Sequence, residues 1–142
     1  MSTWEALQEK AANLNLFLQD WQNMEKQLEQ EPDWQARHTL NEPRRTELRD
    51  SATLLSEGRD TVAELKGAID VLNDAIRATR QELNRNQTVS APTQELINRM
   101  DSAAEQTLHT AQGLRGNFIA VLNIIRADSQ RPPVDDDLNP LS

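Results

Sequence analysis

A seven-residue repeat of apolar and small side chains runs through the middle of the chain and constrains the fold more than any other feature. Its members are separated alternately by three and four residues: Leu48, Ser51, Leu55, Gly58, Val62, Leu65, Ile69, Leu72, Ile76, Thr79 and Leu83. This spacing places one stripe of side chains along a helix that packs against other helices. Because Ser51, Gly58 and Thr79 weaken the stripe, we expect it to form the central helix of an intramolecular bundle, with external pairing open.

Two flanking segments have similar repeats and supply partners for the central helix. The first repeat comprises Trp4, Leu7, Ala11, Leu14, Leu18, Trp21 and Leu28, and the last comprises Ile97, Met100, Ala104, Ala111, Leu114, Phe118, Val121 and Ile125. Pro32 ends the first helix because proline lacks an amide donor, whereas Pro43 suits the first turn of the second. We predict helices over about 3–31, 43–86 and 92–128, with a short helical turn over about 33–41.

The connections between these helices are short, which favours antiparallel neighbours. Arginines begin the second helix and glutamates end the first, so antiparallel packing would place opposite charges together: Arg44, Arg45 and Arg49 against Glu25, Glu29 and Glu31. The predicted fold is all-α, an elongated antiparallel three-helix bundle (up-down-up, with coiled-coil-like packing) over residues 1–128. Residues 129–142 contain three prolines and an acidic run, so we predict a disordered acidic C-terminal tail.

The net charge of −8 is concentrated at the two ends of the chain. Residues 1–34 hold seven acidic residues against Lys10 and Lys26, and the tail adds Asp135, Asp136 and Asp137. Between them, thirteen basic residues are balanced by thirteen acidic ones. No region is basic enough to follow a phosphate backbone, so we expect no nucleic-acid partner.

Three observations indicate a cytoplasmic protein without a membrane span. The chain has no cysteine, as is common in a reducing compartment. Its first residues lack the basic and apolar regions of a secretory signal. The longest apolar stretch, residues 118–125, is far shorter than the ~20 residues that cross a bilayer.

The side chains that catalysis or metal binding would need are few and dispersed. Glu105 and His109 lie on one helical face, but His38 is the only other histidine. A nucleophilic serine or threonine would therefore lack an oriented base. All four glycines fall inside predicted helices and form no phosphate-binding loop. We predict a protein that is not an enzyme, with no catalytic residue, no metal and no cofactor.

Glycines inside helices need an explanation, because each costs roughly 0.5–1 kcal/mol relative to alanine. Gly58 lies on the seam, where its small size would permit close approach of a neighbouring helix. Gly113 and Gly116 precede the apolar run that begins at Phe118. They are either tolerated weak positions or a hinge that reorients the end of the last helix.

The predicted function is protein–protein interaction by a non-enzymatic helical adaptor or scaffold, possibly through self-association. The candidate partner-binding residues gather where the first and last helices meet the second: Trp21, Met24, Phe118, Val121, Leu122 and Ile125. This end is either the thickest part of the core or a place where a partner adds.

Other functions stay open at this stage. One alternative is a small secretion or assembly chaperone that binds an amphipathic client segment, with the 118–125 end as its groove. Another is an acidic decoy of a nucleic-acid-binding surface. The tail is predicted to be a solvating segment, or else a docking peptide with Val134, Leu138 and Leu141 as apolar anchors.

Overall fold

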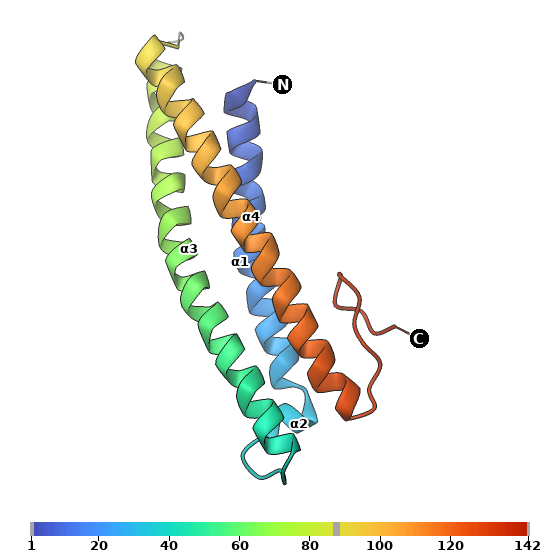
Figure 1. The fold of residues 1–142 in the computed structure, drawn as a ribbon. Helices are drawn as coiled ribbons and strands as arrows, with labels where there is room; N and C mark the ends of the chain where they lie inside the picture. Colours follow the sequence, from blue (N-terminus) through green and yellow to red (C-terminus); the bar gives the residue numbers. More distant parts are fainter. Residues whose placement is uncertain (1, 87–88, 142) are drawn as a thin grey trace. The chain divides into compact units, whose positions relative to one another are not determined.

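The computed structural model describes residues 2–86 and 89–141, and its fold is all-α (Figure 1). The helices are α1 (Thr3–Glu29), α2 (Pro32–Gln35), α3 (Arg44–Asn86) and α4 (Ala91–Asp128). Within the described residues there is no strand, and one isolated β-bridge joins Val134 to Pro140. None of the helices in this part of the chain is long and apolar enough to cross a membrane.

Side chains and turns define the ends of the helices. The Ser2 hydroxyl accepts a hydrogen bond from the Glu5 amide at 3.2 Å, and the Ser90 hydroxyl accepts one from the Thr93 amide at 3.3 Å. At the start of α3 the acceptor is the Glu42 carboxylate, which accepts a hydrogen bond from the Thr46 amide at 3.3 Å. Helix α4 ends in a Schellman turn, with Gln130 in the left-handed region at φ 59°.

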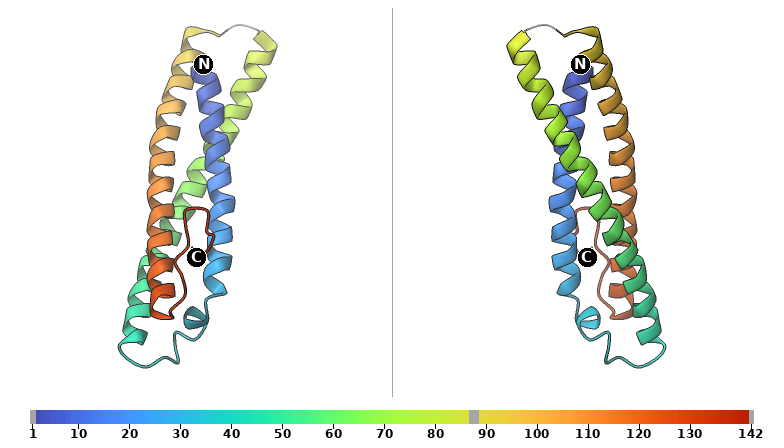
Figure 2. Two further views of the ribbon diagram at one scale, coloured as in Figure 1. Left: turned by 90° about the vertical axis from the view of Figure 1, so that its right-hand side faces the viewer. Right: turned by 90° about the vertical axis from the view of Figure 1, so that its left-hand side faces the viewer.

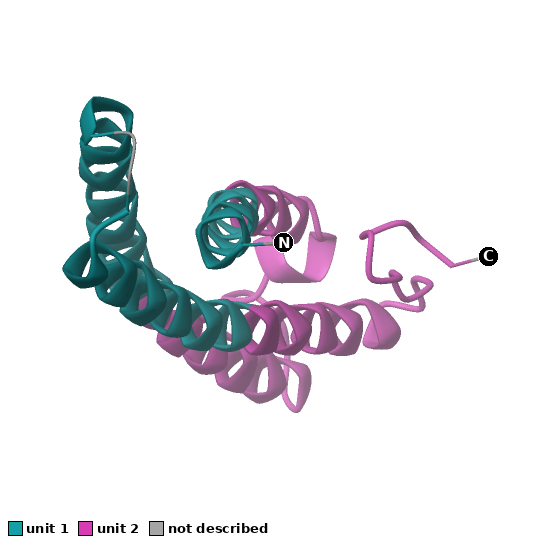
Figure 3. Ribbon diagram, turned by 90° about the horizontal axis from the view of Figure 1, so that it is seen from above, with its two compact units in different colours: residues 1–18, 62–111 teal, residues 19–61, 112–142 magenta. Residues whose placement is uncertain are grey.

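The chain divides into two compact units, which Figure 3 shows in different colours. Unit 1 takes its described residues from Met1–Leu18 and Val62–Ala111, and unit 2 takes its own from Gln19–Thr61 and Gln112–Ser142. Helices α1, α3 and α4 each contribute residues to both units. The expected bundle over residues 1–128 stays a prediction, because the contacts of the chain group into these two units.

Unit 1 has a narrow aliphatic core with polar pairs at its edges. The buried hydrophobic residues are Leu7, Ala11, Leu14, Phe17, Ile69, Ile76, Ile97, Met100, Ala104 and Ala111. Arg80 donates to the Gln8 amide oxygen at 2.8 Å, and Asn15 pairs with Asn73 at 3.1 Å. Since residue numbers fall along α3 as they rise along α1, these two segments are antiparallel.

Unit 2 has a core with larger side chains. Its buried hydrophobic residues are Trp21, Met24, Leu28, Trp34, Leu48, Leu55, Phe118, Ile119, Val121, Leu122, Ile125 and Val134. The rings of Trp21 and Phe118 meet edge to face, with centroids 5.0 Å apart and planes at 74°. This contact fixes α1 against α4 within unit 2.

The arginines at the start of α3 have different partners from those predicted. Arg44 contacts Asp33 at 3.0 Å and Asp128 at 2.7 Å, and it donates to the carbonyl of Ile125. Arg45 pairs with Glu42, three residues away. The predicted pairing of these arginines with Glu25, Glu29 and Glu31 is wrong at Arg44 and Arg45. Asp33 of α2 and Asp128 of α4 supply carboxylates to Arg44, and Glu42, just before α3, supplies one to Arg45.

The prediction of a disordered tail is not confirmed. Residues 129–141, the C-terminal segment, leave α4 and fold back between α1 and α4 of unit 2 (Figure 2). Val134 is 3% exposed, and hydrogen bonds join the main chain of the segment to α1 and α4. An acidic, proline-containing composition therefore does not prevent this segment from having a defined place.

Candidate functional site

An apolar pocket of about 490 Å³ opens between helical segments of unit 2. We call it the apolar groove. Its lining comes from α1, α3 and α4: Trp21, Leu54, Leu55, Glu57, Gly58, Thr61, Leu114, Asn117, Phe118, Ala120 and Val121. Leu54 is 56% exposed at its edge, so the groove presents apolar surface to the outside.

Gly58 allows α3 to approach Trp21 in this groove. A Cβ atom added at Gly58 would lie 3.3 Å from the Cη2 atom of Trp21, closer than most Cβ contacts in proteins. This confirms the close approach predicted from the position of Gly58 on the seam. Gly67, Gly113 and Gly116 have no neighbour within 4 Å of an added Cβ, so packing does not require glycine there.

All six residues predicted to bind a partner lie in unit 2, and all are buried: Trp21, Met24, Phe118, Val121, Leu122 and Ile125. Trp21, Phe118 and Val121 form the inner wall of the apolar groove. Met24, Leu122 and Ile125 are 0% exposed and lie outside its lining, within the core.

The accessible part of the groove comes from residues that the prediction did not select. Leu54 and Ala120 are exposed. Leu54 directly precedes Leu55 of the α3 repeat, and Ala120 directly precedes Val121 of the inner wall. A seam residue points inward, and its neighbour forms the rim. That offset is the sequence signal that could have identified them.

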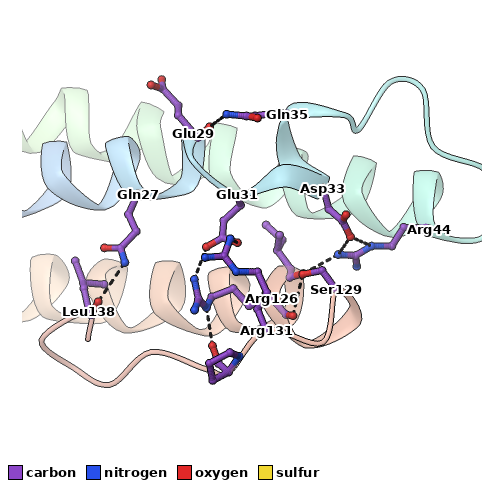
Figure 4. A network of polar contacts seen from close by, with 12 residues as sticks. Gln27, Glu29, Glu31, Asp33, Gln35, Arg44, Arg126, Ser129, Arg131 and Leu138 are labelled. Atoms are coloured by element: carbon purple, nitrogen blue, oxygen red, sulfur yellow. Dashed lines mark hydrogen bonds and ion pairs between the residues drawn. The ribbon is translucent and has the colours of Figure 1, made fainter. Parts of the chain in front are cut away.

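A buried ion network in unit 2 joins α4, the C-terminal segment and the chain between α1 and α2 (Figure 4). Glu31 lies between α1 and α2. Its carboxylate forms ion pairs with Nη1 of Arg126 at 2.5 Å and with Nη1 of Arg131 at 2.6 Å. The side chains of Glu31 and Arg126 are 2% and 3% exposed. Arg126 also donates from Nε to the carbonyl of Pro132 at 2.7 Å. The network ties α4 and the C-terminal segment to the end of α1, and sequence reasoning gave no sign of it.

Four side chains of α1 and α4 hold the C-terminal segment through its main chain. The Asn123 side chain accepts the Val134 amide at 2.8 Å and donates to the Val134 carbonyl at 3.2 Å. Gln27 donates to the carbonyl of Leu138 at 3.1 Å, as Figure 4 shows. Arg115 donates to the carbonyl of Asp136, and Arg126 to that of Pro132. We call Gln27, Arg115, Asn123 and Arg126 the C-terminal seat.

The two histidines lie apart from both features. His109 is exposed, and Glu105 instead has its Oε2 atom 3.2 Å from Nζ of Lys10. His38 lies beside Arg37, Arg45 and Arg49 in a smaller hollow of about 170 Å³. Among the described residues, no three His, Cys, Asp or Glu side chains are grouped so that they could hold a metal ion.

Charge pairs shift several pKa values. The hydrogen bond to Asp101 raises the pKa of Lys10 above its usual range, with a further contribution from Glu105. The Thr46 hydroxyl, followed by Arg45, lowers the pKa of the Glu42 carboxyl. In contrast, a shared hydrogen bond with Asp128 raises the pKa of Glu47. None of these groups lines the apolar groove or belongs to the C-terminal seat.

The chain was compared with models of protein families, with curated proteins and with solved structures, and no match was found in any of the three. A function for this chain therefore has to be argued from its own geometry. The apolar groove and the C-terminal seat are the two features of unit 2 from which such an argument can start.

Proposed function

We propose that this chain is a non-enzymatic adaptor or scaffold of the cytoplasm whose apolar groove binds a helix of a protein partner, which can be another copy of the chain. In this proposal α1, α3 and α4 act as an antiparallel three-helix bundle that presents the groove. The partner is a protein, without a nucleic acid or a cofactor.

The composition of the groove is the observation that supports this function. Its floor is aromatic and aliphatic, whereas Glu57, Thr61 and Asn117 lie among its lining as polar groups. An apolar floor with a few polar groups suits an amphipathic helix that inserts residues from one face. Trp21, which Gly58 allows close to α3, lies in the lining, so an inserted side chain would meet an aromatic ring.

A photo-crosslinking amino acid at position 54 tests the proposal in the native host. Leu54 is 56% exposed at the groove, and Val71, 70% exposed in unit 1, serves as the matched control position. We expect a discrete crosslinked protein, or a crosslinked dimer, from position 54 and not from position 71. Mass spectrometry identifies the product.

The substitution Ala120→Glu shows whether the capture depends on the groove. Ala120 is exposed and lines the groove, so a glutamate there places a charge in the binding surface without replacing a buried side chain. Capture at position 54 should then disappear while the circular dichroism spectrum stays helical. Identical products from both positions, or capture that survives Ala120→Glu, would reject the proposal.

The chaperone alternative uses the same groove and differs in the state of its partner. A chaperone would hold an amphipathic client segment only before that client folds or assembles. Binding of the captured protein in its folded form favours the adaptor, and binding only of its unfolded form favours the chaperone.

A further inference from the structure

The C-terminal segment is bound like a peptide ligand, although it belongs to the same chain. All five hydrogen bonds between the C-terminal seat and the segment involve main-chain atoms of the segment, from Pro132 to Leu138. The Asn123 amide makes two of them, to the amide and the carbonyl of one residue. Such paired main-chain bonds recognise an extended backbone wherever it comes from.

One side chain of the segment supplies its apolar anchor. Val134 is 3% exposed, whereas Leu141 is 48% exposed. Beyond the anchor the segment organises itself, because the Asp135 carboxylate accepts the amides of Asp137 and Asn139 at 2.9 and 3.0 Å. The segment thus carries both a buried anchor and its own turn, and neither requires covalent connection to the seat.

Two donors of the seat, Arg115 and Arg126, also pair with carboxylates elsewhere in unit 2. Arg115 is paired with Asp20 of α1, which directs its guanidinium. Arg126 is fixed by Glu31, a residue of the chain between α1 and α2. Both donors therefore pair with carboxylates outside the C-terminal segment, although Glu31 also pairs with Arg131 of the segment at 2.6 Å. A site with pre-positioned donors loses less entropy on binding.

The turn that returns the segment to its own seat contains an uncommon conformation. Gln130, two residues after the end of α4, has φ 59°, a left-handed conformation that favours glycine. Opening this turn would free Gln130 from that conformation, and residues 131–141 would leave together once the pair of Arg131 with Glu31 breaks. The turn can therefore act as the hinge of an exchange between copies.

We propose that the C-terminal seat is a peptide-docking site that accepts residues 132–138 from a second copy of the chain in exchange for its own. The occupant is a second copy because residues 132–138 of every copy carry the Val134 anchor and the main-chain groups that the seat binds here. This surface shares no residue with the apolar groove, and the inference does not depend on the proposed function.

Two complementary full-length variants test the exchange. Val134→Asp removes the anchor and leaves the seat empty, whereas Asn123→Ala removes the paired main-chain bonds and leaves the segment free. Mixed together, they offer one intact seat and one intact segment. Sedimentation should show a 1:1 complex of the two variants, with an affinity about tenfold or more above that of either variant for itself.

The control is the double variant Asn123→Ala with Val134→Asp, which has neither an intact seat nor an intact segment. Mixed with Val134→Asp alone it should not associate. Circular dichroism checks that each variant is helical, and Val134→Ala replaces Val134→Asp if the charge unfolds the chain. Association of the mixed variants no stronger than that of the separate variants, with helicity intact, would overturn the proposal.

A labelled synthetic peptide of residues 129–142 gives a second, independent measurement. Fluorescence anisotropy should show binding to full-length Val134→Asp and weaker binding to the wild-type chain, whose own segment competes at high effective concentration. Equal binding to both would contradict occupation of the seat by the chain's own segment. Ala120→Glu in the apolar groove should leave this binding unchanged, which separates it from the proposed function.

Discussion

The two units use the same three helices but are stabilised by different interactions. Unit 1 buries mainly aliphatic and small residues, and its ion pairs lie at the surface, such as Lys10 with Asp101 at 21% exposure each. Unit 2 buries Trp21 against Phe118 and encloses an ion pair whose members are 3% and 2% exposed. Burial of charge and of aromatic rings is therefore concentrated in unit 2.

This difference separates two roles of polar groups. A partly exposed pair contributes little net stability, because water competes for both charges. A buried ion pair also contributes little net free energy of folding, because desolvation offsets the attraction. It does make packing arrangements that separate the two charges costly, since each would leave an unpaired charge in the interior. For this reason we expect unit 2, which contains the groove and the seat, to have fewer alternative packing arrangements of similar energy than unit 1.

The largest expected effect comes from removing the buried charge of unit 2. Glu31→Gln leaves Arg126 buried without a carboxylate, which should lower the free energy of unfolding by about 3–5 kcal/mol. The matched change in unit 1, Lys10→Gln, should cost about 1 kcal/mol or less. Urea denaturation followed by circular dichroism measures both. Equal losses would mean that burial of the pair does not distinguish the units.

A smaller effect is expected from two glycines of α3. Gly67→Ala in unit 1 should raise the free energy of unfolding by roughly 0.5–1 kcal/mol, because alanine favours the helix and nothing lies near the added methyl group. Gly58→Ala in unit 2 gains the same preference but brings a methyl group to 3.3 Å from Trp21. We expect no net gain or a loss, measured by thermal denaturation. Equal stabilisation at both positions would show that the Trp21 ring moves aside freely.

The smallest effects concern pH, and both units contain a group with a raised pKa. The hydrogen bond with Asp101 raises the pKa of Lys10, so its contribution to stability is complete below pH 10.5 and is lost as the pH rises through the higher folded value. Lys10→Gln should remove that alkaline loss from the pH dependence of urea denaturation. An unchanged alkaline profile would exclude Lys10 as its source.

In unit 2, the hydrogen bond with Asp128 raises the pKa of Glu47, so its contribution is present below pH 4.5 and is lost as the pH rises through the higher folded value. Glu47→Gln should therefore be slightly more stable than wild type near neutral pH and equal to it in acid. The side chain of Glu47 is 39% exposed, so solvent screening keeps the difference small. A variant that is less stable at neutral pH would contradict this sign.

The periodic part of the fold could be predicted from the sequence because its cause is local. Every residue of the α3 repeat, from Leu48 to Leu83, is buried or half-buried in the structure. The helices were expected over 3–31, 43–86 and 92–128, and they span Thr3–Glu29, Arg44–Asn86 and Ala91–Asp128. Proline positions and capping residues act within a few residues of themselves, so they can be recognised without a tertiary structure.

The candidate sites could be predicted only in part. The sequence located the Trp21 and Phe118 wall of the groove, because large apolar residues cluster there at seam spacing. It did not indicate the pairing of Glu31 with Arg126, which are 95 residues apart. Nor did it decide whether the C-terminal segment docks, because its apolar residues, Val134, Leu138 and Leu141, have no periodic spacing among the prolines and aspartates.

The sequence by itself determined an all-α chain and the faces of its helices that point inward, since heptad spacing converts directly into one side of a helix. The tertiary structure decided which charges are buried, where Leu54 opens a groove and which donors receive residues 132–138. These features arise where side chains from distant segments meet. Their energies depend on burial and on the geometry of the partners, and neither is encoded in local spacing.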